Sequence, residues 1–113
     1  MSAPDLGAWL RRAQEMQTRI AALQRELARR TVQASAGAGL VTATVSGELR
    51  VLQIEIDPQL LAGGDRAMLQ DLVASAVNAA LASAQRMVQE EMQRAAGNMQ
   101  VALGTPPESE SPR

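Results

Sequence analysis

The scarcity of aromatic side chains limits what this chain can fold into. Its 113 residues include one Trp, no Phe and no Tyr, although 46% of them are hydrophobic. Much of the apolar content is alanine and leucine, which pack helices closely but fill a thick core poorly. We therefore expect one small functional unit whose apolar surface forms helix seams and a subunit interface.

The chain also has no histidine, cysteine or lysine, and this absence removes most catalytic chemistry. Imidazole bases, thiolates and reactive amines are the usual groups for proton transfer and nucleophilic attack. Zinc sites lose their usual ligands as well. Glu55 and Asp57 are the nearest approach to a carboxylate pair, but no other catalytic group accompanies them. We expect no enzyme activity, no metal, no cofactor and no small-molecule substrate.

The sequence carries no evident targeting or membrane segment. The first ten residues include Asp5 and lack an apolar run of signal-peptide length. A run of about 18 contiguous apolar residues, which a membrane span would need, occurs nowhere. A cytoplasmic protein without a membrane partner is therefore expected.

Positive charge is concentrated at the N-terminal end of the chain. The whole chain carries a formal net charge of -1 at pH 7. Its first 33 residues hold six arginines and three acidic residues, a net charge of +3. The other 80 residues hold five arginines and nine acidic residues, a net charge of -4. This balance argues against a polycation that holds DNA by bulk charge, but it leaves one basic segment.

Apolar residues recur every seven positions, in two interleaved series, along the first 30 residues. The series are Leu6, Ala13, Ile20 and Leu27, and Trp9, Met16 and Leu23. This spacing predicts a helix over residues 4–30 that buries a narrow stripe. At about 100° per residue, the arginines of this segment fall within an arc of about 140° on the opposite side. They are Arg11, Arg12, Arg19, Arg25, Arg29 and Arg30.

An alternation of apolar and polar side chains replaces the helical pattern after this segment. Residues 40–46 and 50–56 both alternate, and the turn Ser46-Gly47-Glu48 lies between them, which predicts a β-hairpin. Residues 32–36 are expected to add a further strand, although alanine and serine favour strands less. Strands therefore occupy residues 31–57. In the last of them the alternation separates Leu52, Ile54 and Ile56 from Val51, Gln53 and Glu55.

Capping signals divide the rest of the chain into a short and a long helix. Asp57-Pro58 predicts a short helical turn, with the aspartate as N-cap and the proline in the first helical position. After the break at Gly63-Gly64, Asp65 is a suitable N-cap for a second long helix, expected over residues 65–100. Residues 104–113 are rich in Pro, Ser and Glu and are expected to be disordered.

The arginine arc of the first helix has two interpretations. Arginine presents a planar fork to phosphate oxygens, so several arginines along one helix can bind a duplex. Alternatively, the arc is a solvated face whose charges are matched within the helix. Glu15 is four residues from both Arg11 and Arg19, and Glu26 is four residues before Arg30. Carboxylates at this spacing can form intrahelical ion pairs with arginine.

Trp9 lies in the same helix. An aromatic ring beside arginines can anchor a helix at a membrane surface or stack on nucleic-acid bases. The position of Trp9 in the apolar stripe favours a third use, which is packing against a partner helix.

Short motifs in a specific order and spacing follow one another between residues 10 and 95. They are Met16-Gln17 in an Arg- and Gln-rich opening helix, Gly37-Ala38-Gly39-Leu40-Val41-Thr42-Ala43-Thr44-Val45-Ser46-Gly47, Ile54-Glu55-Ile56-Asp57-Pro58, Leu69-Gln70-Asp71-Leu72, and Ala76-Val77-Asn78-Ala79-Ala80. In these motifs the chain resembles the YbaB/EbfC family of bacterial nucleoid-associated proteins. It departs from the family at Ala38, Gln70 and Ala79, where Gly, Glu and an acidic residue are common, and it lacks the family's frequent lysines.

The resemblance implies an α+β fold of a long helix, a three-stranded antiparallel sheet and a second long helix. A single domain over residues 1–103 would pair into a tweezer-like homodimer whose helices approach double-stranded DNA. Together with the arginine arc, this suggests a cytoplasmic, nucleoid-associated protein that organises the chromosome or affects transcription. The alternatives are a prefoldin-like coiled-coil chaperone, a protein-interaction adaptor, and a structural partner in a protein complex.

Two sets of residues are expected to carry these interactions. The DNA-binding set is Arg11, Arg12, Arg19, Arg25, Arg29, Arg30, Arg86 and Arg94. The set expected in the dimer interface or core is Trp9, Met16, Ile20, Leu23, Leu27, Val41, Val45, Leu52, Ile54 and Ile56.

Overall fold

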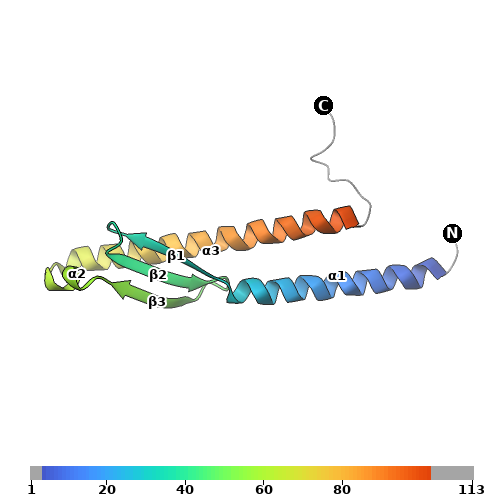
Figure 1. Ribbon diagram of the computed structural model, residues 1–113, viewed down its shortest axis with the longest axis horizontal. Helices are drawn as coiled ribbons and strands as arrows, with labels where there is room; N and C mark the ends of the chain where they lie inside the picture. The colour runs from blue at the N-terminus through green and yellow to red at the C-terminus, as the bar shows by residue number, and fades with distance from the viewer. Residues whose placement is uncertain (1–3, 103–113) are drawn as a thin grey trace, which may run out of the picture. The chain divides into compact units, whose positions relative to one another are not determined.

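The computed structural model describes residues 4–102, which form two long helices, a sheet and a short helix (Figure 1). In chain order the elements are α1 (Pro4–Arg29), β1 (Thr31–Ala36), β2 (Val41–Ser46), β3 (Val51–Ile56), α2 (Pro58–Ala62) and α3 (Arg66–Ala102). The expected α+β fold is confirmed, including the less certain strand, which is β1. The disorder predicted for residues 104–113 lies outside the described residues.

The chain divides into two compact units. One unit consists of residues 27–90 and includes the whole sheet, α2 and most of α3. The described part of the other unit consists of α1 up to Glu26 and α3 from Glu91. Both long helices therefore contribute to both units.

β2 is the central strand of an antiparallel sheet with the order β1-β2-β3. Ala43 of β2 stands opposite Ala34 of β1 on one side and opposite Ile54 of β3 on the other. Because β2 has a neighbour along both edges, its inward side chains are completely covered, and Val41, Ala43 and Val45 have no exposed surface. The core of the sheet unit is centred on this strand.

An alanine stripe on α3 packs against the same face of the sheet. Ala76, Ala80 and Ala84 are fully buried and form one cluster with the three buried residues of β2. They recur every four residues, which keeps them on one side of the helix. Methyl side chains let the α3 backbone approach the strands closely, so that little volume remains to be filled. The core is thin, in agreement with the lack of aromatic residues.

The opposite face of the sheet is polar. Gln33 Nε2 donates a hydrogen bond to Thr44 Oγ1 at 3.1 Å, and the hydroxyl oxygens of Ser35 and Thr42 lie 2.9 Å apart and share a hydrogen bond. Each pair joins residues that stand directly opposite each other in β1 and β2. The alternation predicted for β2 is therefore confirmed, since its apolar residues face α3 and its threonines face away.

The alternation predicted for the last strand is wrong at its first residues. The register between β2 and β3 shifts between Thr44 and Val45, which marks a β-bulge. As a result Val51, rather than Leu52, stands opposite the buried Val45. Leu52 is the extra residue that the bulge inserts into β3. Val51 therefore pairs with a buried residue of β2 and does not belong to the polar face of the sheet.

The turn between β1 and β2 holds a non-glycine residue in the left-handed region. Gly37, Ala38 and Gly39 have φ angles of 64°, 57° and 91°. Left-handed backbone costs a residue with a Cβ atom about 1–2 kcal/mol. We therefore expect Ala38→Gly to raise the free energy of unfolding by up to about 1 kcal/mol, measured by urea denaturation followed by circular dichroism.

A second alanine-to-glycine change provides the control for this prediction. Ala79 is exposed on α3, where glycine is expected to lower the free energy of unfolding by about 1 kcal/mol. The two substitutions should thus act with opposite signs. Equal destabilisation by both would show that Ala38 carries no backbone strain.

Both predicted caps of the C-terminal helices are confirmed. Asp57 Oδ1 accepts a hydrogen bond from Gln59 N at 2.8 Å at the start of α2. Asp65 Oδ1 accepts one from Met68 N at 3.0 Å at the start of α3. Each carboxylate satisfies a backbone N–H that has no partner within its helix.

By length and composition, α3 is apolar enough to cross a membrane. An 18-residue stretch within Arg66–Asn98 has a mean hydropathy of 1.2, and 17% of that stretch is buried in the structure. The sequence expectation differed because it required an uninterrupted apolar run, whereas mean hydropathy tolerates serine and asparagine among many alanines. The core helix of a soluble protein meets the same criterion, and the alanine stripe of α3 is buried against the sheet.

Candidate nucleic-acid interface

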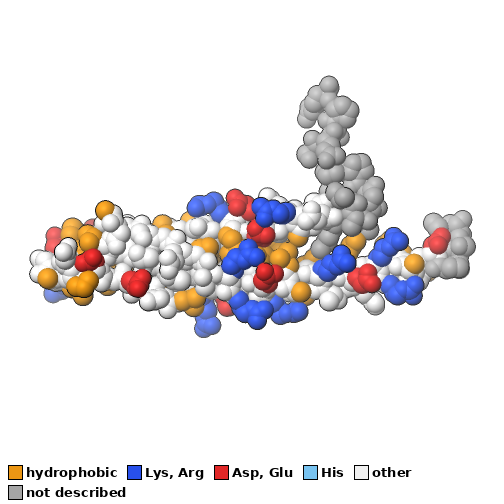
Figure 2. Space-filling view, viewed as in Figure 1, with side chains coloured by type: hydrophobic (Ala, Val, Ile, Leu, Met, Phe, Trp, Pro, Cys, Tyr) orange, Lys and Arg blue, Asp and Glu red, His pale blue; other side chains and the backbone are white. Residues whose placement is uncertain are grey.

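α1 is a continuous helix of 26 residues that exposes all five of its arginines, and Arg30, directly after it, is exposed as well. At 1.5 Å per residue, the distance along the axis from Arg11 to Arg29 is about 27 Å. Arginine side chains stand out from α1 along its length, with carboxylates among them (Figure 2). The helix therefore presents a row of guanidinium groups on the arc predicted from the sequence.

Most of these guanidinium groups have no carboxylate partner. Within residues 4–102, no ion pair involves Arg11, Arg12, Arg19, Arg25 or Arg29. The intrahelical pairs considered for Glu15 are thus not formed in the described part of the chain. Arg30 and Glu26 differ, since both are engaged in interactions. Five arginines of α1 are therefore available to an anionic ligand.

The two arginines of α3 have different surroundings. Arg94 Nη1 lies 2.7 Å from Glu91 Oε2, and this ion pair leaves 66% of the Arg94 side chain exposed. Arg86 is also exposed, and among the described residues no ion pair involves it. Arg86 belongs to the sheet unit, whereas Arg94 belongs to the other unit. Arg94 is thus partly neutralised by its own helix, whereas Arg86 is not.

The residues expected in the dimer interface or core have three kinds of environment. The buried ones are Leu27, Val41 and Val45, and the half-buried ones are Met16, Ile20, Leu23 and Ile56. The exposed ones, with the exposed fraction of each residue, are Trp9 at 61%, Leu52 at 55% and Ile54 at 39%. The first two groups account for internal packing, while the exposed group has no cover in a single chain.

β3 is an edge strand that carries much of this uncovered apolar surface. Val51, Leu52 and Ile54 are all exposed, and Leu49 in the preceding turn is exposed as well. An edge strand with exposed apolar side chains is a template for pairing with another strand. The sequence interpretation missed Val51 because strict alternation assigned it to the polar face, and the bulge changes that assignment.

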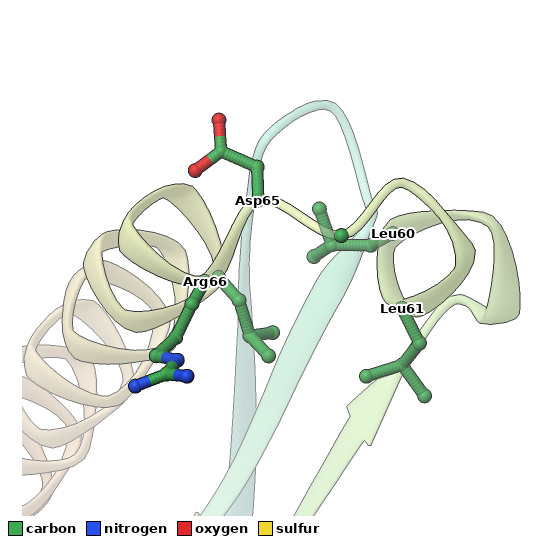
Figure 3. A pocket seen from close by; sticks show the side chains of 6 residues that line it. Leu60, Leu61, Asp65 and Arg66 are labelled. Carbon is green, nitrogen blue, oxygen red and sulfur yellow. The ribbon is translucent and has the colours of Figure 1, made fainter.

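Two shallow hollows are lined by Leu60 and Asp65, where α2 turns into α3, and Figure 3 shows the side chains that line one of them. Their volumes are about 160 and 280 Å³, and leucine side chains form much of their lining. Asp65 lies at their rim and directs its carboxylate away from Leu61, where it serves as the cap of α3. No hydroxyl, thiol, imidazole or amine side chain lines either hollow. In the described part of the chain, no three acidic side chains are grouped as metal ligands.

A family model decides what kind of protein this is. The model of the YbaB/EbfC DNA-binding family matches residues 1–99. The chain belongs to this family. The family resemblance seen in the sequence motifs is therefore confirmed, and YbaB/EbfC proteins are nucleoid-associated DNA-binding proteins rather than enzymes.

Curated relatives support the YbaB/EbfC assignment along most of the chain. A nucleoid-associated protein of Pelotomaculum thermopropionicum is 39% identical over 101 residues, which are 89% of this chain and 96% of the relative. One from Chlorobium phaeobacteroides is 41% identical over 88% of this chain and 87% of the relative. One from Moorella thermoacetica is 46% identical over 73% of this chain and 79% of the relative.

A solved structure shares the YbaB/EbfC fold seen in this chain. The crystal structure of an uncharacterized protein from Helicobacter pylori aligns with a TM-score of 0.56 and 24% sequence identity. The alignment covers 88% of this chain and 97% of the other chain. At this identity the likeness shows the fold alone.

Proposed function

We propose that this protein is a nucleoid-associated protein whose α1 arginines bind the phosphates of duplex DNA. The observation that carries the proposal is the row of five exposed arginines along one helix, none of which forms an ion pair among the described residues. A planar guanidinium matches phosphate oxygens in geometry as well as in charge. Family membership supports DNA as the ligand.

The chemistry of the row favours the DNA backbone over the base edges. A length of about 27 Å corresponds to roughly eight base pairs of duplex, so successive arginines can reach several phosphates. Phosphate contacts fix the position of a protein on DNA but carry no direct sequence information. We therefore infer that the protein organises the chromosome, or affects transcription, through the shape that it imposes on DNA, in the cytoplasmic nucleoid.

A homodimer completes this proposal. The exposed apolar edge of β3 would be covered by the same edge of a second copy, in the two-fold arrangement of most homodimers. Two copies would bring two α1 rows to the same duplex, which offsets the net charge of -1 on each chain. Small domains with a thin core also gain stability by association.

A double substitution in the arginine row tests the DNA-binding proposal. Arg25→Ala together with Arg29→Ala should weaken binding to unrelated duplexes by similar factors, because phosphate contacts are lost. Each neutralised phosphate contributes about -0.9 to the slope of log affinity against log salt. The slope should therefore flatten by about two units for each subunit engaged, measured by fluorescence anisotropy of labelled DNA across a salt titration.

Arg50→Ala with Arg66→Ala provides the matched control, because it removes the same charge from exposed positions outside α1. This control should retain the wild-type slope. If both double variants lose affinity equally, bulk charge explains binding. If neither loses affinity while the wild type binds, the α1 row is a solvated face, and suppression of client aggregation then becomes the relevant assay for a chaperone or adaptor.

A charge on the exposed edge tests the dimer. Ile54→Asp should leave the monomer folded, since Ile54 is 39% exposed in the single chain, but should bury a carboxylate in the proposed interface. Sedimentation at micromolar concentration should give twice the monomer mass for the wild type and a monomer for this variant. Ser35→Asp on β1 is the control and should stay dimeric. A wild-type monomer at that concentration would overturn the dimer proposal.

A further inference from the structure

The exposed arginines of α1 lie along two lines on the helix surface. At about 100° per residue, Arg11, Arg25 and Arg29 lie within about 40° of one another around the helix axis. Arg12 and Arg19 lie within about 20° of each other, and about 100° away from the first line. All five side chains are exposed, and none forms an ion pair among the described residues. α1 therefore carries two separate lines of available positive charge.

A carboxylate lies on the strip between these two lines. Glu15 is exposed and is about 50° from either line. It is four residues from both Arg11 and Arg19, a spacing that allows ion pairs, yet it forms none within residues 4–102. Ala22 follows on the same strip one heptad later and is exposed, whereas Glu26 is engaged in an interaction. On this strip Glu15 is thus the carboxylate that is available to a ligand.

Two lines of arginines on either side of a strip match the major groove of duplex DNA. The groove is about 12 Å wide, admits an α-helix and has a phosphate backbone along each wall. A helix lying in it turns one side toward the base edges, while side chains on both flanks of that side reach phosphates. In this arrangement each line of arginines binds one backbone, and Glu15 faces the base edges. The short side chain of Ala22 lets the helix approach the floor of the groove.

The negative charge of Glu15 selects among the base edges. Guanine and thymine present hydrogen-bond acceptors in the major groove and would repel a carboxylate, whereas the N4 amino group of cytosine is a donor. The N6 amino group of adenine is also a donor, but the N7 acceptor lies beside it. A carboxylate at this point therefore suits cytosine and penalises other bases, so it discriminates by repulsion as well as by attraction.

We propose that Glu15 determines a base preference by accepting a hydrogen bond from cytosine N4 in the major groove. The inference rests on the proposed function, because the arginines must bring α1 to DNA before Glu15 can reach a base. The phosphate contacts supply most of the affinity, and Glu15 adds a preference for G·C pairs to binding that is otherwise independent of sequence.

Three duplexes of 20 base pairs test this preference. One contains only G·C pairs, one contains only A·T pairs, and the third is the G·C duplex with N4-methylcytosine in place of cytosine. The methylated base keeps its Watson–Crick pairing but loses the amino hydrogen that faces the major groove. By fluorescence anisotropy, we expect the wild type to bind the unmodified G·C duplex about fivefold more tightly than either of the others. One hydrogen bond belongs at the low end of the range for bidentate base contacts, about 5- to 150-fold.

Substitutions of the carboxylate separate base contact from bulk charge. Glu15→Ala should abolish the preference and raise the affinity for the A·T duplex, because no carboxylate then faces acceptor edges. Glu15→Gln should favour the A·T duplex, since glutamine pairs with N6 and N7 of adenine. Glu90→Ala is the matched control: it removes the same charge from an exposed position of α3 and should keep the fivefold preference. Circular dichroism should show that all three variants retain their helix content.

Other results would overturn the inference. Equal binding of the wild type to all three duplexes, with the expected salt slope, would exclude a base contact while preserving the proposed function. A preference for G·C pairs that survives N4-methylation would mean that Glu15 does not contact N4. If Glu15→Ala and Glu90→Ala raised the affinity for every duplex alike, Glu15 would act through bulk charge only. Failure of the wild type to bind any DNA would instead refute the proposed function.

Discussion

Replacing Gly47 with alanine is expected to destabilise the fold severely. A Cβ atom at this position would lie 1.8 Å from the carbonyl oxygen of Leu27 and 2.8 Å from its carbonyl carbon. Both are backbone atoms at the end of α1, so no side-chain rotation relieves the clash. Gly47 N also donates a hydrogen bond to Arg30 O at 2.9 Å, which holds the turn against the helix end.

The loss should be about 3 kcal/mol or more, because either the turn or the end of α1 must move. Urea denaturation followed by circular dichroism measures it. Gly63→Ala is the matched control: a Cβ there would meet its nearest atoms at 3.6 Å, and its φ of -69° suits any residue. If Gly47→Ala had the same midpoint as Gly63→Ala, the close approach of turn and helix would be absent in solution.

Enlarging the alanine stripe should produce the second large effect. Ala80 is fully buried in the middle of the stripe, in the same cluster as Val41, Ala43 and Val45 of the central strand. Leucine adds three carbon atoms where the helix backbone lies close to the sheet. Overpacking of this kind costs about 1–3 kcal/mol, and the central position places Ala80→Leu at the upper end of that range.

The neighbouring residue offers a control of the same chemistry. Ala79 is exposed on α3, so Ala79→Leu adds the same atoms to solvent and should change the free energy of unfolding by less than about 0.5 kcal/mol. Thermal and urea denaturation of both variants would compare them directly. Equal stability of the two would mean that α3 can move away from the sheet without loss.

Local signals explain why so much of the fold is readable from the sequence. The heptad spacing of α1 and the aspartate caps of α2 and α3 depend on residues within one or two helical turns. The bulge in β3 depends on the partner strand instead, so it could not be inferred from β3 alone. The same is true of the division into two units, because tertiary contacts define it and no linker composition marks it.

The candidate site was only partly predictable. The arc of arginines on α1 follows from helix geometry alone, and the structure places those side chains on one exposed face. Which of them lack a carboxylate partner depends on side-chain rotamers, and the spacing of Glu15 suggested pairs that are not formed among the described residues. The exposure of Trp9 was hidden for a related reason, since heptad position indicates which face a residue occupies but not whether anything covers it.

The alanine stripe raises the question of what fixes α3 along the sheet. Three identical side chains spaced by four residues look nearly the same after a slip of one helical turn, about 5.4 Å. Leu72 breaks this degeneracy. Its Cδ1 atom lies 2.9 Å from the place where a Cβ of Gly37 would be, so the leucine occupies the space that the glycine leaves open in the turn between β1 and β2. The fit between a loop glycine and Leu72 thereby opposes a one-turn slip of α3 along the sheet.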